Sequence, residues 1–267
     1  MEMRPGSYEM SGERQALMLC VRYKEKINEN NCFEVDHQTM KKFFEEFGFQ
    51  YHIVLDKNVE DMHKAVEDFR DHINHSRTNI SCVLVVTSCH GGQDTIQDAR
   101  GKTLDVEHII KPFGDESCPK MKGQPKIFII DTCRGSNNDT GVESGSIVDF
   151  KLSNEAIATT EYRASRVSPC INDMLVAYAA MTDYTAWMNS FVGSYMIHNI
   201  TQVFSSRDAA QEHMYDLFVK ANAKLVEKTM QLSDDKGKQR FKSIMTIEST
   251  LRKLIYLGRK THTGIKE

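Results

Sequence analysis

Two short apolar runs constrain the fold of this chain more than any other feature. The first, at residues 83–86, leads directly to His90, and the second, at residues 127–130, leads to Cys133. Each run is short, rich in branched side chains and followed by polar residues and glycine, which predicts a buried strand. Open α/β sheets place reactive groups just beyond the carboxyl ends of such strands. The two runs therefore predict a thiol and an imidazole on neighbouring strand ends.

The rest of the first half alternates between strand and helix patterns. Apolar residues with helical spacing occur at 40–47 and at 62–73, and further strands are expected at 16–21, 51–55 and 174–179. A short helix is expected at 106–110. Strands that alternate with helices pair in parallel, with the helices on the faces of the sheet. The sequence predicts an open α/β sheet of about six mostly parallel strands, with helices on both faces.

The pattern stops between residues 136 and 171, where Gly, Ser, Asn and Thr predominate. A stretch of this length without a period is usually functional or disordered. Beyond it we expect helices at 194–204 and 211–230, a charged loop, and a final strand pair at 244–250 and 254–257.

Composition excludes several classes of protein. A net charge of −3 and a pI of about 6.4 do not indicate a nucleic-acid-binding protein. Seven cysteines without CxxC spacing indicate a reducing compartment and no structural zinc. The polar first twelve residues do not resemble a signal peptide, and no apolar run approaches a membrane span. We expect a cytoplasmic globular protein that contains no metal or cofactor and does not enter a membrane.

Four motifs occur in an order that resembles the caspase family of cysteine proteases. Residues 131–135 resemble its active-site pentapeptide, usually Gln-Ala-Cys-Arg-Gly, and residues 89–91 resemble its Ser-His-Gly. Residues 173–179 resemble the strand that opens its small subunit, and residues 187–195 its substrate-binding loop and following helix. The resemblance covers nearly the whole chain. It implies one caspase-like domain, with a large-subunit segment at 1–135, a linker at 136–171 and a small-subunit segment at 172–267.

The resemblance implies a thiol protease site. The thiolate of Cys133 would attack the peptide carbonyl, and His90 would handle the proton of the leaving amine. The backbone N–H groups of Gly91 and Cys133 would hold the developing oxyanion. Tyr184 and Trp187 would line an apolar subsite.

The same resemblance implies an altered substrate pocket. Caspases cut after aspartate because two arginines and the pentapeptide glutamine surround that side chain. Here these three positions fall on Asn30, Met188 and Asp131. A buried carboxylate without its charged partner costs about 3–5 kcal/mol, so cleavage after aspartate is not expected.

Two functions remain open from the sequence. In the first, the chain is a catalytically impaired homologue that binds a caspase zymogen, or itself, through its last strand (residues 245–251), and so regulates apoptosis. In the second, it is an active cysteine endopeptidase in which Asp131 favours a basic residue at the cleavage point. Asp149, in the linker, is a candidate processing site for another caspase.

Overall fold

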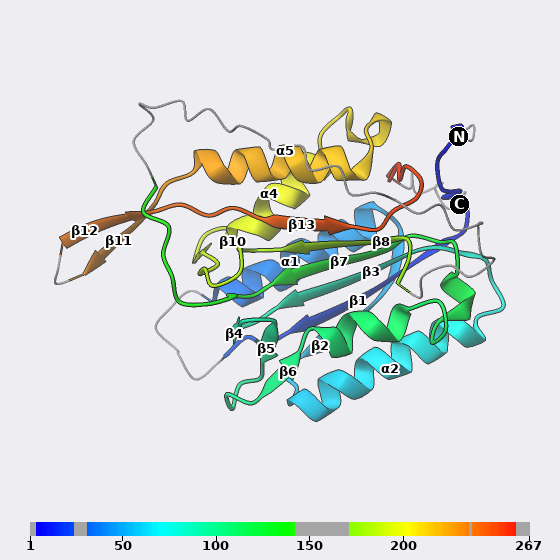
Figure 1. Cartoon of the computed structure of the whole chain (residues 1–267), viewed down its shortest axis with the longest axis horizontal. Coiled ribbons are helices and arrows are strands. Elements are labelled where there is room, and N and C mark those ends of the chain that lie inside the picture. The colour runs from blue at the N-terminus through cyan, green and yellow to red at the C-terminus, as the bar shows by residue number, and fades with distance from the viewer. Residues whose placement is uncertain (1–3, 24–30, 142–170, 235–236, 260–267) are drawn as a thin grey trace, which may run out of the picture.

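Six strands form the central sheet of the computed structural model, which describes residues 4–23, 31–141, 171–234 and 237–259. Their order across the sheet is β13-β8-β7-β3-β1-β2 (Figure 1). The strands are β1 (Glu13–Cys20), β2 (Phe49–Leu55), β3 (Ile80–Ser88), β7 (Lys126–Asp131), β8 (Met174–Tyr178) and β13 (Thr246–Ser249). The first five pair in parallel, and β13 runs antiparallel to β8. This confirms the predicted sheet of about six mostly parallel strands.

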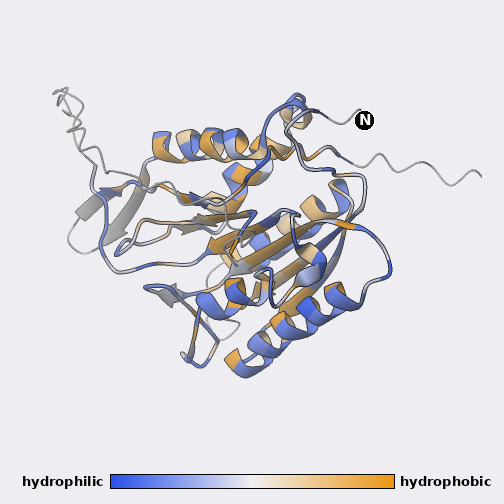
Figure 2. Cartoon of the chain, turned by 45° about the vertical axis from the view of Figure 1, so that its right-hand side comes forward, coloured by the Kyte–Doolittle hydropathy of each residue, from blue (hydrophilic) through white to orange (hydrophobic). Residues whose placement is uncertain are grey.

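Helices cover both faces of the sheet, as predicted (Figure 1). One core contains side chains of α1 (Cys32–Glu46), α4 (Tyr195–Phe204) and α5 (Met214–Glu227). The other contains side chains of α2 (Val59–His75) and α3 (Glu107–Ile110). In Figure 2 the central strands are largely hydrophobic, whereas the outer helices alternate between hydrophobic and hydrophilic residues. Within the described ranges, no helix is both long and apolar enough to cross a bilayer.

Polar side chains cap three of the helices that cover the sheet. Asn31 accepts hydrogen bonds from the backbone N–H groups at the start of α1, and Asn58 does the same for α2. Ser194 caps α4 by accepting from Met196 N and Ile197 N. Such caps satisfy backbone donors that have no partner within the helix, and each is worth about 1 kcal/mol.

The predicted strand at 254–257 is wrong. Only Leu254 forms a β-bridge there, with Ser7, and it lies outside the main sheet. The backbone of this segment is used differently, because Ile255 O accepts from Met214 N at the start of α5. The apolar run at 254–257 therefore contacts the start of α5 and does not form a strand of the sheet.

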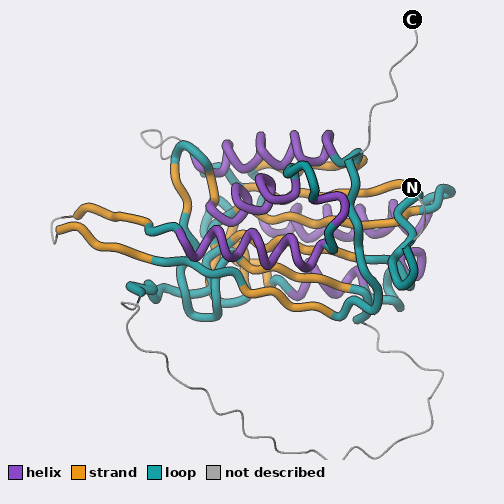
Figure 3. The backbone as a smooth tube through the Cα atoms, turned by 90° about the horizontal axis from the view of Figure 1, so that it is seen from above, coloured by secondary structure: helices purple, strands orange, loops and turns teal. Residues whose placement is uncertain are grey.

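Three small sheets lie in segments that the sequence presents as polar loops. They are formed by β4 (Gly91–Gly92), β5 (Thr95–Gln97) and β6 (Thr103–Asp105); by β9 (Met188–Asn189) and β10 (Gly193–Ser194); and by β11 (Met230–Asp234) and β12 (Gly237–Phe241). Short 3-10 helices occur at η1 (Lys111–Phe113), η2 (Pro119–Met121) and η3 (Ala209–Gln211). Figure 3 shows the β11–β12 hairpin reaching away from the body of the protein.

Candidate active site

The sheet brings Cys133 and His90 to the same edge. Strands β3 and β7 are parallel neighbours, and the last pair in their register is Ser88 with Asp131. His90 and Cys133 each lie two residues beyond that pair, on the carboxyl side of their strands. A hydrogen bond of 3.3 Å from Cys89 N to Asp131 O continues the pairing past the strand ends. The two side chains that the sequence singles out thus leave adjacent strands at equivalent positions.

Cys133 is half-buried, and its thiol lies 3.7 Å from the carbonyl oxygen of Ala186. Burial raises the pKa of the thiol above its ordinary value, and the nearby Asp131 carboxyl adds to the increase. A thiol with a raised pKa is mostly protonated at neutral pH and is a weak nucleophile without a neighbouring base.

Aromatic rings hold the His90 imidazole in place. The ring centroid of Tyr23 lies 4.4 Å from that of His90, and the ring of Phe33 meets it edge-on at 5.0 Å. The backbone N–H of His90 donates to the Tyr23 hydroxyl at 2.9 Å, and this hydroxyl donates to Gln97 O at 2.7 Å. The imidazole therefore contacts two aromatic side chains, Tyr23 after β1 and Phe33 on α1, and the Tyr23 hydroxyl is held by the backbone of β5.

Gly91 occupies a position that accepts no side chain. A Cβ atom there would lie 2.1 Å from Thr95 O and 2.2 Å from Thr132 Oγ1, far inside van der Waals contact. The close approach keeps the backbone of β4 against the strand-end loop that carries Cys133. Glycine is the residue that permits such an approach.

Asp131 lies inside the protein, with only 2% of its surface exposed. Its Oδ1 accepts from the Ser194 hydroxyl at 2.8 Å, and its Oδ2 has no hydrogen-bond partner. Burial raises its pKa well above the ordinary value, and the charge of the neighbouring Asp36 adds to this. A protonated, enclosed carboxyl of this kind is poorly suited to pair with a basic side chain of a substrate.

The remaining predicted groove residues lie on the segment that leads into β9. Trp187 stacks on Phe241, with ring centroids 4.6 Å apart and planes 13° from parallel. Met188 is partly buried against the core on the α1 side, and Tyr184 is 37% exposed. The backbone of Tyr184 is fixed, because its carbonyl accepts from Arg134 N at 3.0 Å. Asn30 and Asp149 lie outside the described residues.

Sequence reasoning missed Asp36 and Ser194, which both contact the region of Asp131. Asp36 lies four residues before Met40, on the apolar face of α1, so an acid at a core position was the available signal. Ser194 directly precedes an apolar helical run, which is the signature of a helix cap. Neither pattern predicts that these residues meet Asp131, because the three residues lie far apart in the sequence.

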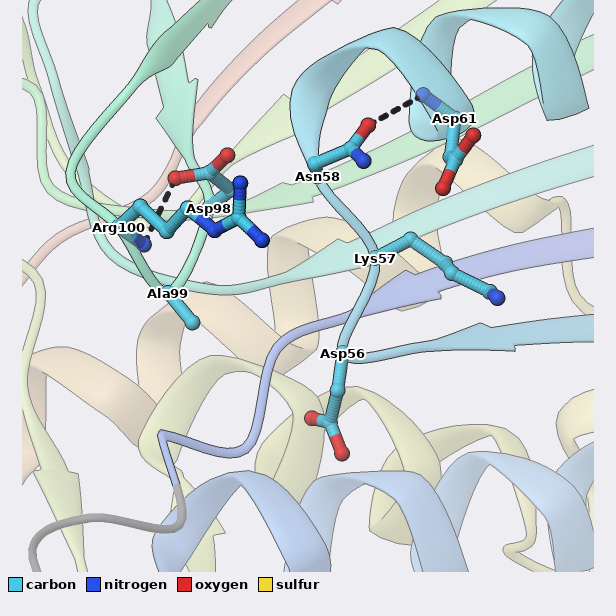
Figure 4. A pocket seen from close by; sticks show the side chains of 7 residues that line it. All are labelled: Asp56, Lys57, Asn58, Asp61, Asp98, Ala99 and Arg100. Carbon is cyan, nitrogen blue, oxygen red and sulfur yellow. Dashed lines mark hydrogen bonds between the residues drawn. The ribbon is translucent and has the colours of Figure 1, made fainter.

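A second, polar pocket lies at the start of α2 (Figure 4). It is lined by Asp56, Lys57, Asn58, Asp61, Asp98, Ala99 and Arg100. Its buried acid, Asp98, accepts from the backbone N–H groups of Val59, Arg100 and Lys102. Asp56 pairs with Arg22 at 2.7 Å. Asp98 and Asp56 therefore already have hydrogen-bond or ion-pair partners within the protein. The contacts of Asp98 link the start of α2 to the loop between β5 and β6.

Comparison with known proteins agrees with this geometry. The family model of the caspase domain matches residues 13–256. The chain is 26% identical to caspase-14 of Homo sapiens over 250 residues, covering 94% of this chain and 95% of that protein. It is 28% identical to caspase-2 of Gallus gallus over 198 residues, covering 73% and 46%. The crystal structure of caspase-1 from Spodoptera frugiperda superposes with a TM-score of 0.79 at 19% identity, covering 99% and 98% of the two chains. The chain belongs to the caspase family of cysteine proteases.

Proposed function

We propose that this protein is a caspase homologue that does not process aspartyl substrates and that regulates apoptosis in the cytoplasm by binding a caspase zymogen. The observation that carries the proposal is the state of Asp131, which takes the place of the pentapeptide glutamine. It is buried, hydrogen-bonded to Ser194 and next to a second acid, Asp36. Met188 replaces one arginine of the pocket. A substrate aspartate would meet the Met188 thioether in place of an arginine, and the enclosed Asp131 would offer it no donor, at a cost of about 3–5 kcal/mol.

The partner surface in this proposal is β13. This strand is the last in the order of the central sheet and pairs on one side with β8, Ile247 lying opposite Ala177. Glu248 and Ser249 are exposed. An edge strand presents backbone donors and acceptors that a second strand can satisfy, and a closed dimer is the usual result. A zymogen occupied in this way could not pair with its own copy.

The first test is catalytic. Caspase peptides with aspartate at the cleavage point should be cut no faster by the wild-type protein than by Cys133→Ala. Efficient cleavage that is lost in Cys133→Ala would overturn the proposal, because it would require an aspartate-binding pocket.

The second test is binding of a purified, catalytically dead caspase zymogen. Binding should survive Cys133→Ala and should be lost in Ile247→Asp, because a charge is not tolerated within the strand interface. Val219→Asp is the matched control, since Val219 is a 48% exposed valine on α5 and its replacement introduces the same charge. Equal binding by Ile247→Asp and wild type would exclude β13 as the contact, and self-association alone would exclude the zymogen as partner.

The retained pair of His90 and Cys133 favours a second candidate function, an endopeptidase of altered specificity. Its pocket would contain Met188 and a neutral Asp131. A positional peptide library decides between the two functions. Cleavage after basic residues that depends on both Cys133 and Asp131 would support the altered protease against the regulatory function, whereas no Cys133-dependent cleavage of any peptide would exclude the protease.

We also propose that the chain works as two associated segments, 1–135 and 172–267, joined by the linker 136–171. Strands β7 and β8 come from different segments and pair in parallel over five residue pairs, from Lys126 with Met174 to Ile130 with Tyr178. A cut in the linker, at Asp149 or nearby, should therefore leave two fragments that elute together. Limited proteolysis followed by gel filtration checks this, and a first cut elsewhere would contradict it.

A further inference from the structure

Two buried carboxyl groups meet at one serine behind the candidate active site. Ser194 N donates to Asp36 Oδ1 at 2.8 Å, and the Ser194 hydroxyl donates to Asp131 Oδ1 at 2.8 Å. Asp36 comes from α1, Asp131 ends β7, and Ser194 ends β10 and caps α4. All three are almost fully enclosed, with exposures of 0%, 2% and 1%. We call Asp36 and Asp131 the acid pair.

The two acids are not equivalent. Asp36 accepts a second hydrogen bond, from the Ser88 hydroxyl at 2.9 Å, whereas Asp131 Oδ2 has no partner. Neither acid forms a salt bridge anywhere in the described part of the chain. Two enclosed carboxyls without a cation cannot both ionise at neutral pH. Asp36, which accepts hydrogen bonds at both of its carboxyl oxygens, therefore carries the charge when one is present, and Asp131 keeps its proton.

The acid pair is linked to the peptide groove through Ser194. This serine pairs with Met188 across the β9–β10 hairpin and caps α4. The next backbone N–H, that of Tyr195, donates to Trp187 O at 3.2 Å. On the other side, a Cβ atom at Gly193 would lie 2.2 Å from Asp36 Oδ1, so the hairpin backbone rests directly on the carboxyl. Asp36 therefore contacts the hairpin that contains Met188 and directly follows Trp187.

We propose that Asp36, Asp131 and Ser194 are positioning residues that set the placement of the β9–β10 hairpin according to the ionisation of the acid pair, so that the peptide groove changes shape between mildly acidic and mildly basic pH. In this role Asp131 faces Ser194 and acts on substrate binding through the hairpin. This role is independent of whether the protein cleaves peptides, because it affects the shape of the groove and not the reactivity of the thiol.

Burial raises the pKa of Asp36 to about 7, which agrees with a transition near neutrality. The titratable groups beside the pair are Cys20 on β1, Cys89 after β3 and Cys133 after β7. Glu34 and His37 are on the same helix as Asp36, His90 follows Cys89, and His198 is on α4. Burial raises the pKa of Cys89 to about 12, and it also raises that of Cys20, so neither thiol ionises near neutrality. The histidines are the groups that need control variants.

Trp187 is the only tryptophan of the chain, so intrinsic fluorescence reports the groove directly. We expect the emission of the wild-type protein to change between pH 5.5 and 8.5 with a single midpoint near pH 7. Asp36→Asn should lose the transition. Asp131→Asn should leave its midpoint nearly unchanged, because Asp131 is already neutral throughout this pH range. Ser194→Ala should keep the transition, because it removes only the hydroxyl that binds Asp131 and retains the backbone N–H that donates to Asp36. His37→Gln and His198→Gln should keep the wild-type curve.

Infrared spectroscopy of the folded wild-type protein gives a second measurement that does not depend on how the variants fold. The band of a protonated buried carboxylic acid should persist at pH 8 and should be missing from Asp131→Asn. An emission curve that is flat from pH 5.5 to 8.5 would overturn the proposal. So would a transition that remains in Asp36→Asn or disappears in either histidine variant. Absence of the carboxylic acid band at pH 8 would show that Asp131 is ionised and would also overturn it.

Discussion

Two buried aspartates at opposite ends of the central sheet differ in their hydrogen-bond and charge partners. Asp131 ends β7 at the carboxyl edge, and Asp173 precedes β8 at the amino edge, where its carbonyl accepts from Lys126 N. Asp173 is 1% exposed but accepts from Tyr8 Oη at 2.6 Å and from Arg252 Nε at 2.9 Å and Nη2 at 2.5 Å. Asp131 accepts one hydroxyl and has no cation beside it.

The partners decide the charge of each acid. Burial alone would raise the pKa of Asp173, but the hydrogen bonds from Arg252 and Tyr8 outweigh it and lower the pKa below its usual value. Burial and the charge of Asp36 raise the pKa of Asp131 instead. At the amino edge, Asp173 thus has hydrogen-bond partners for its carboxylate and connects three parts of the chain. The carboxyl edge keeps unsatisfied groups beside a thiol and an imidazole, which is typical of a functional site.

The largest expected effect is at the amino edge. Asp173→Ala should lower the free energy of unfolding by about 3 kcal/mol, because it leaves the Tyr8 hydroxyl and the Arg252 guanidinium without their shared acceptor. Urea unfolding at pH 7 measures this. The expected loss of stability is at the low end of the range for buried ion pairs because Arg252 is 53% exposed and can be hydrated.

The pH dependence of this loss sharpens the comparison. A lowered pKa means that Asp173 stabilises the fold above its unfolded pKa of about 3.9, and that this contribution disappears as the pH falls through the folded value. The difference between wild type and Asp173→Ala should therefore shrink on acidification below about pH 4. A constant difference at all pH values would show that the loss comes from packing and not from charge.

A second prediction concerns the backbone at the carboxyl edge. Gly193 has a φ of +74°, which strains any other residue, and an added Cβ would lie 2.2 Å from Asp36 Oδ1. Gly193→Ala should cost about 2 kcal/mol of stability. Gly123→Ala is the control, since Gly123 has a similar φ of +76° but no atom within 4 Å of the added Cβ. Equal losses in the two variants would mean that contact with the acid pair adds nothing.

The third prediction is a substitution that increases stability. Asp131→Asn should raise the free energy of unfolding by about 1–2 kcal/mol at pH 8 and leave it nearly unchanged at pH 4. The folded wild type holds more protons than the unfolded chain above about pH 4, because the acid pair has raised pKa values, so its stability falls as the pH rises toward 7 and beyond. An amide needs no proton to be neutral. Destabilisation by Asp131→Asn at pH 8 would indicate an ionised Asp131 and would remove the contrast between the two edges.

The sequence predicts the parts of this fold that depend on local pattern. The apolar runs ending at His90 and Cys133 become β3 and β7, and the helical spacing at 40–47 and 62–73 becomes α1 and α2. The two-residue strands β4, β9 and β10 are not predictable, because they exist only through antiparallel pairing of polar segments. The run at 254–257 has strand propensity, but contacts with the start of α5 decide its conformation.

The candidate site is predictable to a similar extent. A strand-end thiol and imidazole follow from position in the chain, and resemblance supplies the order of the motifs. The setting of Asp131 does not follow, because its neighbours Asp36 and Ser194 lie far away in the sequence and meet only when α1, β7 and α4 come together. A charged residue at the first position of the pentapeptide suggests a charge in the groove, whereas its tertiary surroundings favour a neutral group.

The smallest expected effect tests a single hydroxyl at the satisfied edge. Tyr8→Phe removes a donor to Asp173 and an acceptor for Arg252 N while leaving the ring in place. The two arginine hydrogen bonds remain, so we expect a loss of about 1 kcal/mol, well below that of Asp173→Ala. Tyr184→Phe serves as the control, because that side chain is 37% exposed and the loss of its hydroxyl should leave the core unchanged. Urea unfolding of both variants at pH 7 measures the difference. A loss in Tyr8→Phe as large as that in Asp173→Ala would mean that the hydroxyl, and not the guanidinium, keeps Asp173 ionised, and that the two edges differ in hydrogen bonding more than in charge.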